Sequence, residues 1–338
     1  MGLKGYLLKR FAYMGVLIFF VLTLNFIIFE LIPGTSGVLD SLIGSGRDFS
    51  PEQIAKLRAL YHIDDPLAVR YEAYLYNMFT LNFGLSFRTH NPVLQDMIAF
   101  LPNTMVLLGI STILSIVVGI ALGILSAYKR GGALDSTSVV ASLTTFSLPT
   151  FWMGLLFLAI FSLQLRWFPF GGSTPPEWLI RPPCISPCLD ILPALTVIIT
   201  RIQYAVLPLL TLTLFQYGFY VLLTRATMLE ALTEDYIVTA RAKGLSERTV
   251  LVKHAFKNAS LPIVTSVALA FATILGGAII TETVFRWPGL GLWTFLSITT
   301  RDIPVLQAIF YIAALAVIVA NFIADIIYGV IDPRIKYG

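Results

Sequence analysis

The chain has 338 residues, of which 57% are hydrophobic and 12% are charged, and its mean hydropathy is +0.82. A soluble domain carries about 25% charged residues, so this much apolar surface excludes a single water-soluble core and requires lipid as the solvent. The net charge of +4 is small, and no basic run is interleaved with aromatic residues, so we expect no nucleic-acid partner.

Six apolar stretches are long enough to cross a bilayer, which takes about 20 apolar residues per helix. They are Phe11–Pro33, Pro102–Tyr128, Val139–Leu165, Val206–Leu229, Pro262–Thr281 and Pro304–Gly329. The first is too long for the core of a signal peptide. The sequence therefore predicts an all-α integral membrane protein with six transmembrane helices. A further apolar segment, Asp190–Tyr204, contains Pro193 and Arg201, so we expect it to be interfacial or re-entrant.

Basic residues flank the span ends that should face the cytoplasm. They are Lys4, Lys9, Arg10, Lys129, Arg130, Arg334 and Lys336. We therefore expect a multi-pass protein of the cell membrane with both termini in the cytoplasm. The segments Thr35–Leu101, Arg166–Ala205 and Phe285–Ile303 would lie outside.

The middle of every predicted span lacks a charged residue, and Glu30, Glu282 and Asp325 lie near span ends. A charge at the bilayer centre costs roughly 2.5–3.5 kcal/mol and is usually functional. Its absence argues against an ion-coupled secondary carrier, which remains a remote alternative. An intramembrane enzyme is also disfavoured, because the three histidines are far apart and no span contains a Lys or His to activate a serine.

Residues 34–101 form a candidate extracytoplasmic helical subdomain. Ser50, Pro51 and Gln53 have the residue types of a helix start with an N-cap, a proline at N1 and a capping box. Asp65 begins a second candidate helix. Its apolar face would contain Leu67, Tyr71, Tyr74, Leu75 and Met78. This subdomain would either pack over the first two spans or serve as a docking surface or outer lid.

The only cysteines are Cys184 and Cys188, in a proline-rich outer loop. They are either free thiols or a disulfide, and we favour the disulfide because an oxidising compartment permits it and a closed loop is stabilised. A zinc site usually needs four ligands and no histidine is nearby, so we expect no metal.

A charged cassette between the fourth and fifth spans, within the loop 230–262, has the signals of a helical hairpin. The segment Asp235–Lys243 is expected to be a helix ended by Gly244 in the left-handed conformation. Ser246 would cap the next helix, with Glu247 in its first turn. The other interpretation is an unstructured loop. A structured hairpin on the aqueous side of a membrane protein indicates a partner.

The cassette has the sequence DYIVTARAKGLSERTVLVKHAFKNASLP and resembles the cytoplasmic signature of permease subunits of dipeptide/oligopeptide/nickel-type ABC importers. The general importer signature begins Glu-Ala-Ala, with Gly six positions after the Glu. Here Val238, Ala240 and Gly244 occupy the Glu, second Ala and Gly positions. The valine, and a longer spacing to Pro262, are shared with the peptide subfamily.

The resemblance extends over nearly the whole chain. Its other motifs are LIPG (31–34), SPEQIAKLRALYHIDDPL (50–67), FGLSFRTHNPV (83–93), SLPTFWMGLL (147–156), LPLLTLTL (207–214), ETVFRWPGLG (282–291), RDIPVLQA (301–308) and DPRI (332–335). The CISPC loop and a second LP-x-LT copy at Leu192–Thr196 depart from the family.

The resemblance implies a type I ABC importer permease with a first helix (1–33), the outer subdomain (34–101) and a core permease domain (102–338). Such a permease pairs with a second permease, expected here to be a different but homologous chain. It also pairs with two cytoplasmic ATPases and an extracytoplasmic binding protein. No Gly-Lys dipeptide occurs, so the chain has no Walker A loop and is not expected to be an enzyme. ATP and magnesium would be bound by the partner ATPases. Peptides are the expected substrate, with oligosaccharides or nickel as alternatives.

Two groups of site residues follow from the resemblance. The group expected to dock into an ATPase and act as a near-rigid lever comprises Tyr236, Ala240, Arg241, Gly244, Leu245, Ser246, Glu247 and Arg248. The group expected at an outer gate or binding-protein contact comprises Glu282, Phe285, Trp287, Pro288 and Gly289. The alternative role for Glu282 is an interfacial carboxylate that pairs with Arg286 one turn later.

Overall fold

The computed structural model describes residues 3–31, 65–177 and 191–331. Their backbone is nearly all helical, with one isolated antiparallel bridge between Leu85 and Pro92, which confirms the all-α prediction. The chain divides into two compact units. Unit 1 comprises Met1–Thr104, Ala272–Ile279 and Gly289–Gly338, and unit 2 comprises Met105–Phe271 and Ile280–Pro288.

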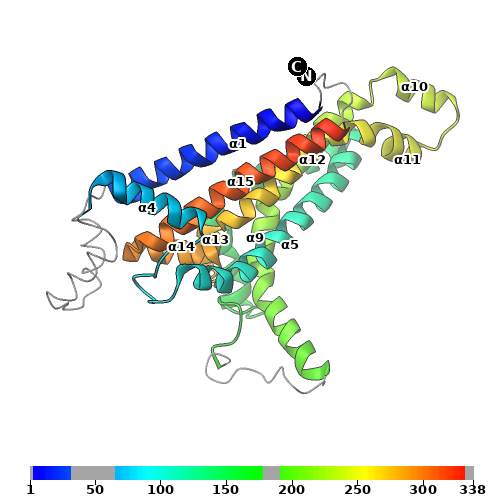
Figure 1. Cartoon of the computed structure of the whole chain (residues 1–338). Helices are drawn as coiled ribbons and strands as arrows, with labels where there is room; N and C mark the ends of the chain where they lie inside the picture. Colours follow the sequence, from blue (N-terminus) through cyan, green and yellow to red (C-terminus); the bar gives the residue numbers. More distant parts are fainter. Residues whose placement is uncertain (1–2, 32–64, 178–190, 332–338) are drawn as a thin grey trace. The chain divides into compact units, whose positions relative to one another are not determined.

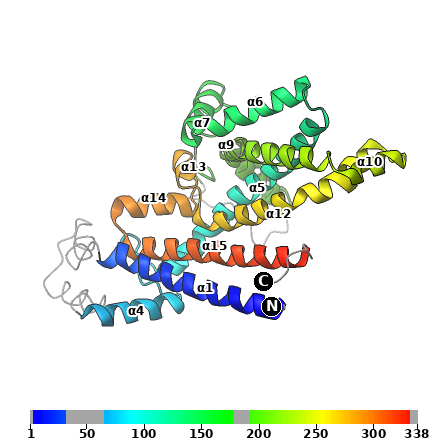
Figure 2. The ribbon, with the colours of Figure 1, turned by 90° about the horizontal axis from the view of Figure 1, so that it is seen from above.

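Unit 1 is built around two long helices that lie side by side (Figures 1 and 2). These are α1 (Leu3–Phe26), which continues into the π-helical turn η1 (Ile27–Leu31), and α15 (Ile303–Ile331). Its shorter elements are α4 (Leu67–Phe79), the start of α5 (Val93–Tyr128), η4 (Ile274–Gly276) and α14 (Leu290–Thr300).

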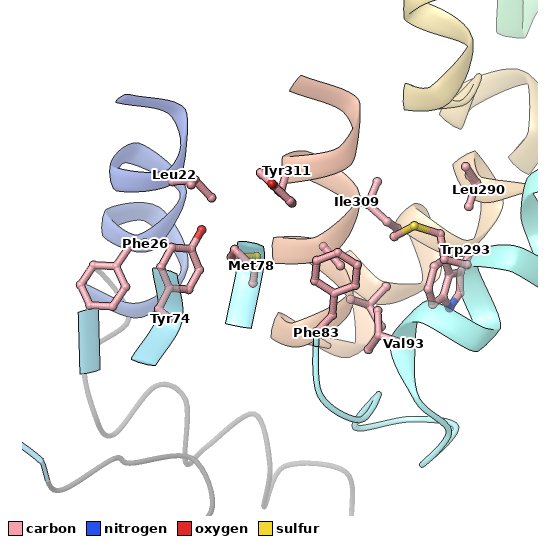
Figure 3. Packing of buried hydrophobic residues seen from close by; sticks show 13 residues of the cluster. Leu22, Phe26, Tyr74, Met78, Phe83, Val93, Leu290, Trp293, Ile309 and Tyr311 are labelled. Carbon is pink, nitrogen blue, oxygen red and sulfur yellow. The ribbon is translucent and has the colours of Figure 1, made fainter. Parts of the chain in front are cut away.

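Large side chains from these helices form the core of unit 1 (Figure 3). Phe26 of α1 packs against Tyr74 of α4, and Trp293 of α14 stacks on Phe100 at 5.3 Å between ring centroids. Tyr74 and Met78 are buried on the face predicted for α4, whereas Leu67 at its start is exposed. The helix predicted to start at Ser50 lies outside the described residues.

Unit 2 contains the rest of α5 and the remaining helices. They are α6 (Ala133–Ser147), α7 (Thr150–Phe157) with the π-helical η2 (Leu158–Gln164), α9 (Ile191–Ala231), α10 (Asp235–Ala242), α11 (Glu247–Thr249), the π-helical η3 (Val250–Ala255), α12 (Phe256–Thr273) and α13 (Ile279–Val284). Glycines bring its long helices close together. A Cβ at Gly119 of α5 would lie 2.3 Å from the Cβ of Tyr220, and one at Gly123 would lie 2.5 Å from the Cβ of Thr224. The pair forms the G-x-x-x-G pattern of close helix packing.

Four helices are long and apolar enough to cross a membrane, which supports a multi-pass protein. They are Lys9–Leu31, Val93–Tyr128, Leu195–Ala231 and Ile303–Ile323. The pair α6 and α7 with η2 would add a fifth span, but it is bent by 98°. Within the described residues, length and composition therefore indicate four or five spans rather than the six predicted.

The bend corrects the prediction of one continuous span over Val139–Leu165. Pro149 has no backbone N–H and disfavours the helical conformation of the residue before it. Leu148 is accordingly extended, with φ −80° and ψ 133°. The apolar stretch is therefore two helices joined at a proline.

The segment Asp190–Tyr204 is not a separate span, as predicted, and its interfacial or re-entrant position stays a prediction. From Ile191 onward it is the first part of α9, which has 41 residues. Pro193 does not interrupt it, because a proline in the first helical turn lacks only an N–H that would have no intrahelical partner. At 1.5 Å per residue α9 is about 60 Å long, twice the roughly 30 Å hydrocarbon core of a bilayer.

The predicted fifth span, Pro262–Thr281, is divided as well. Helix α12 ends at Thr273, the turn η4 follows, and Gly277 has φ +72°. A Cβ at Gly277 would lie 2.7 Å from the backbone nitrogen of Gly291, so two backbone segments of unit 1 approach closely here. The predicted span runs to Thr281, whereas the helix in this stretch already ends at Thr273.

Candidate functional site

The hairpin around Gly244 has the turn that the sequence predicts. Helix α10 covers Asp235–Ala242, one residue shorter than expected, and the backbone N–H of Gly244 donates to the carbonyl of Arg241 at 2.9 Å. Gly244 has φ +73°, and a Cβ there would meet nothing within 4 Å. The glycine is therefore required by its backbone conformation and not by packing.

The second arm of the hairpin begins where expected but is built differently. Ser246 is extended, yet its hydroxyl lies 2.9 Å from the hydroxyl of Thr249 instead of accepting a backbone N–H. Three α-helical residues are followed by the π-helical η3 before α12 begins. The side-chain cap predicted for Ser246 is therefore wrong, although the position of the helix start is confirmed.

An ion pair closes the hairpin across the glycine turn. Arg241 Nη2 donates to Glu247 Oε1 at 2.7 Å, and both side chains are partly exposed. This hydrogen bond raises the pKa of the Arg241 guanidinium above its ordinary value. The pair joins α10 to α11 directly, so it stabilises the hairpin without any contact from a partner protein.

The hairpin residues predicted to dock into an ATPase divide into two sets. Ala240 is buried and Tyr236 is half-buried, and both face the interior of unit 2. The exposed set comprises Arg241, Gly244, Leu245, Ser246 and Arg248, with Glu247 half-buried among them. Two exposed apolar side chains that were not among the predicted docking residues, Val238 and Val252, lie on the same hairpin.

A hydrophobic cluster anchors the hairpin to the ends of two long helices. We call it the hairpin cluster; its buried members are Ala127, Met228, Ala231, Ile237, Ala240, Val250, Leu251, Ala255 and Ala259. Ala127 lies at the end of α5 and Met228 at the end of α9, while Ile237 comes from α10. Burial of these side chains fixes the hairpin to α5 and α9.

The segment Ile280–Pro288, which was predicted to lie outside from Phe285 onward, is also packed within unit 2. Phe285 is 2% exposed and lies against Leu158 and Leu207. Its carbonyl accepts the backbone N–H of Gly172 at 2.9 Å, and a Cβ at Gly154 would lie 3.0 Å from its ring. Phe285 is therefore held by the chain's own helices and loops.

Of the other predicted gate residues, Glu282, Trp287 and Gly289 are buried and Pro288 is half-buried. Trp287 is 3% exposed, and its backbone N–H donates to the carbonyl of Glu282 at 2.8 Å. Glu282 has no exposed surface. The units divide between Pro288 and Gly289. Cys184 and Cys188 lie outside the described residues.

The structure adds an ion pair that the sequence analysis missed, between the buried Asp135 and Arg225, whose side chain is 27% exposed. In unit 2, Arg225 of α9 donates from Nε and Nη2 to the carboxylate of Asp135 at 2.6 and 2.9 Å. The two residues are 90 positions apart. The sequence does contain one signal for this pair. Both residues are ionisable and lie at the ends of largely apolar segments, where a charged side chain usually pairs with another polar group.

The chain matches a known protein family along most of its length. Residues 119–337 match the family described as binding-protein-dependent transport system inner membrane component, and residues 3–108 match its N-terminal region. The sequence is 34% identical over 321 residues to the protein of Escherichia coli K12 named dipeptide transport system permease, with 93% of each chain covered.

Two further relatives cover almost the whole chain. A dipeptide transport system permease of Alkalihalophilus pseudofirmus is 34% identical over 342 residues, covering 98% of this chain and 99% of the relative. A protein of Brucella abortus named as a peptide transport system permease is 34% identical over 331 residues, with 98% of each chain covered. The resemblance found in the sequence motifs is confirmed. The chain belongs to the family of binding-protein-dependent transport system inner membrane components, and it is a multi-pass membrane permease subunit.

Proposed function

We propose that this chain forms one half of the translocation path of an ATP-driven importer for di- and oligopeptides. A second, homologous permease would form the other half. Two cytoplasmic ATPases would bind ATP and magnesium, and a binding protein would deliver the substrate from outside. The chain would itself bind no nucleotide, since it lacks the Gly-Lys pair of a phosphate loop.

The observation that carries this proposal is the hairpin around Gly244. Its inner face is buried in the hairpin cluster, while its turn, with Leu245 and Arg248, is exposed. A helical element that is fixed to two long helices on one side and free on the other can receive a partner and pass on its movement as a rigid body. We assign the ATPase contact to this exposed turn.

We further propose six membrane crossings, with both termini and the hairpin in the cytoplasm. The crossings would be α1, α5, the bent pair α6–α7, α9, α12 and α15. The basic flanks of the apolar segments support this orientation. The domains would be the first helix, the outer subdomain 34–101 and the core permease domain 102–338.

The outer gate is proposed to include Glu282, Phe285 and Trp287. Their burial within unit 2 means that the gate would act through the helices that hold Phe285, rather than as an exposed apolar tip that waits for a partner. Pro288 and Gly289 would bend the chain where the two units meet in sequence.

The peptide substrate rests on the names of the relatives, which are dipeptide and peptide permeases at 34% identity over nearly the full length. Oligosaccharides and nickel remain the alternative substrates for the same machinery. Substrate choice would rest mainly with the binding protein, which is a separate chain.

Reconstitution tests the proposal. The chain is assembled in proteoliposomes with its companion permease, ATPases and binding protein, and uptake of a labelled dipeptide, an oligosaccharide and nickel is measured with and without ATP. We expect dipeptide uptake that requires ATP and the binding protein. Uptake by the chain alone, driven by an ion gradient, would show a secondary carrier instead. If ATP drives uptake of only the oligosaccharide or only nickel, the proposed peptide substrate is wrong.

A further inference from the structure

The carboxylate of Asp135 is the meeting point of three parts of unit 2. It accepts hydrogen bonds from the Ser126 hydroxyl at the end of α5 and from the Gly131 N–H in the turn after α5, the latter at 2.9 Å. It also accepts two from Arg225 of α9. Asp135 itself lies in the first turn of α6 and is 4% exposed. One buried side chain therefore fixes α6 to both α5 and α9.

Stability alone is a weak reason for such a pair. Burying the carboxylate of Asp135 costs free energy, the Arg225 side chain is still 27% exposed, and apolar residues often stabilise a fold as well as an ion pair does. What the pair gives is a defined geometry, because a bidentate guanidinium–carboxylate contact sets both distance and orientation. Asp135 and Arg225 therefore determine how the start of α6 lies on α9.

The pair lies directly beside the anchor of the hairpin. Ser126, which donates to Asp135, precedes Ala127 of the hairpin cluster, and Arg225 lies three residues before Met228 of the same cluster. Three helical residues span about 4.5 Å along the axis, so the ion pair and the hairpin cluster are neighbouring layers of α5 and α9.

At its other end, α6 leads to the segment that contains Phe285. It bends by 98° at Pro149 into α7, and Gly154 of α7 packs against the Phe285 ring. The hairpin, the ion pair, α6, α7 and Phe285 all belong to unit 2. A continuous series of packed elements thus joins the cytoplasmic hairpin to the outer segment.

We propose that the Asp135–Arg225 ion pair is the joint that makes α6 move together with the cytoplasmic hairpin. Both are positioning residues: they touch neither substrate nor ATPase, and they pass the movement of the hairpin to α6, α7 and Phe285. This inference rests on the proposed function of the hairpin as the ATPase contact. Without the pair, the hairpin would still bind its ATPase and α6 would still pack on α9, but the first turn of α6 would lose its fixed position, so less of the hairpin's movement would reach α6.

The first test measures coupling in the reconstituted importer. In Asp135→Asn, we expect basal ATP hydrolysis to remain within about twofold, because the exposed hairpin turn is unchanged. Stimulation by the binding protein and peptide transported per ATP should each fall about tenfold, a size typical of coupling between distant sites. Arg225→Lys keeps the charge but cannot form the bidentate contact, so it should lie between wild type and Asp135→Asn.

A matched control separates coupling from loss of a buried charge pair. In unit 1, Arg70 donates to Glu30 at 3.0 Å and is also buried, but this unit does not contain the hairpin. Glu30→Gln should leave the peptide transported per ATP unchanged. The proposal is overturned if Asp135→Asn transports as much peptide per ATP as wild type, or if Glu30→Gln lowers this ratio as much as Asp135→Asn does. Failure of the wild-type complex to transport peptide would instead reject the proposed function.

A distance measurement tests the joint itself and needs only an assembled complex. Spin labels are placed at Thr137→Cys on α6 and Thr239→Cys on α10, both exposed positions, with Cys184 and Cys188 replaced by serine. In wild type the distance should be the same with and without ATP, because the pair makes the two helices one body. In Arg225→Lys it should change on ATP addition. A distance that already changes in wild type, or that stays fixed in the variant, contradicts the inference.

Discussion

Large aromatic side chains fill the core of unit 1, whereas glycine and alanine bring the helices of unit 2 together. The aromatic residues of the first core are Phe26, Tyr74, Phe83, Trp293 and Tyr311. The small residues at the interfaces of the second include Gly119, Gly123, Ala240, Ala255 and Ala259. These two sets of residues respond to opposite changes: removing atoms from the aromatic set should damage unit 1, and adding atoms at Gly119 or Gly123 should damage unit 2.

The difference fits the roles proposed for the two units. Between apolar helices in a membrane, close van der Waals packing of small residues replaces the hydrophobic effect as the source of association. Helices that pack backbone to backbone cannot slide without opening the interface. Unit 2 contains the hairpin and the Phe285 segment, so its small-residue interfaces would help it transmit movement as a rigid body.

The largest effect is expected from Gly119→Leu in unit 2. A Cβ at this position would already lie 2.3 Å from the Cβ of Tyr220, so α5 and α9 must separate. We expect a loss of stability above about 3 kcal/mol, beyond the usual range for overpacking. Thermal unfolding of the purified chain in detergent measures it. The control is Gly109→Leu on the same helix, where a Cβ meets nothing within 4 Å. Equal melting temperatures for the two variants would contradict close packing at Gly119.

The second effect is expected from Trp293→Ala in unit 1. The side chain is 2% exposed and stacks on Phe100, so truncation leaves a cavity that should cost about 3–5 kcal/mol. Phe295→Ala removes a half-exposed ring from the same helix and should change stability far less. Urea or thermal unfolding distinguishes them. If Phe295→Ala lowers the stability more than Trp293→Ala does, Trp293 is not part of the packed core of unit 1.

The hairpin shows which features can be predicted from sequence. The end of α10 and the positive φ of Gly244 depend on local chemistry, and the prediction was accurate to one residue. The bend at Pro149 was missed although the proline is visible, because a count of apolar residues ignores backbone conformation. The Asp135–Arg225 pair joins positions 90 residues apart, and no local pattern specifies such a partner.

The segment around Phe285 shows that burial is also hard to predict. Phe285 and Trp287 were expected at an outer gate or binding-protein contact, and both are apolar, but the sequence does not say what covers them. In the structure Leu158 and Leu207, from distant helices of unit 2, lie against Phe285. A motif can identify a segment, whereas burial depends on packing between segments far apart in the chain.

The third prediction concerns Gly244 and distinguishes a general loss of stability caused by backbone strain from a specific loss of transport. Gly244→Val forces a β-branched residue to φ +73°, which costs about 1–2 kcal/mol and distorts the turn proposed to enter the ATPase. We expect binding-protein-stimulated ATP hydrolysis and uptake to be lost. The control is Gly84→Val in unit 1, where φ is +78° and a Cβ also meets nothing within 4 Å. Gly84→Val should lower the free energy of unfolding by a similar amount but leave peptide uptake unchanged. Normal uptake in Gly244→Val would refute the assignment of the coupling turn.

The smallest effect is expected at the exposed ion pair between Arg241 and Glu247. Exposed pairs contribute about 0–1 kcal/mol, and salt screens them because the Debye length falls to about 3 Å at 1 M. Glu247→Gln should therefore lower the melting temperature slightly at low salt and not at high salt. Asp135→Asn alters a buried carboxylate that accepts hydrogen bonds from Ser126, Gly131 and Arg225, so it should lower the melting temperature by more at both salt concentrations. If Glu247→Gln proves as damaging as Asp135→Asn, the hairpin is held by its surface charges rather than by the hairpin cluster. The mechanical link from hairpin to α6 would then have to run through Glu247.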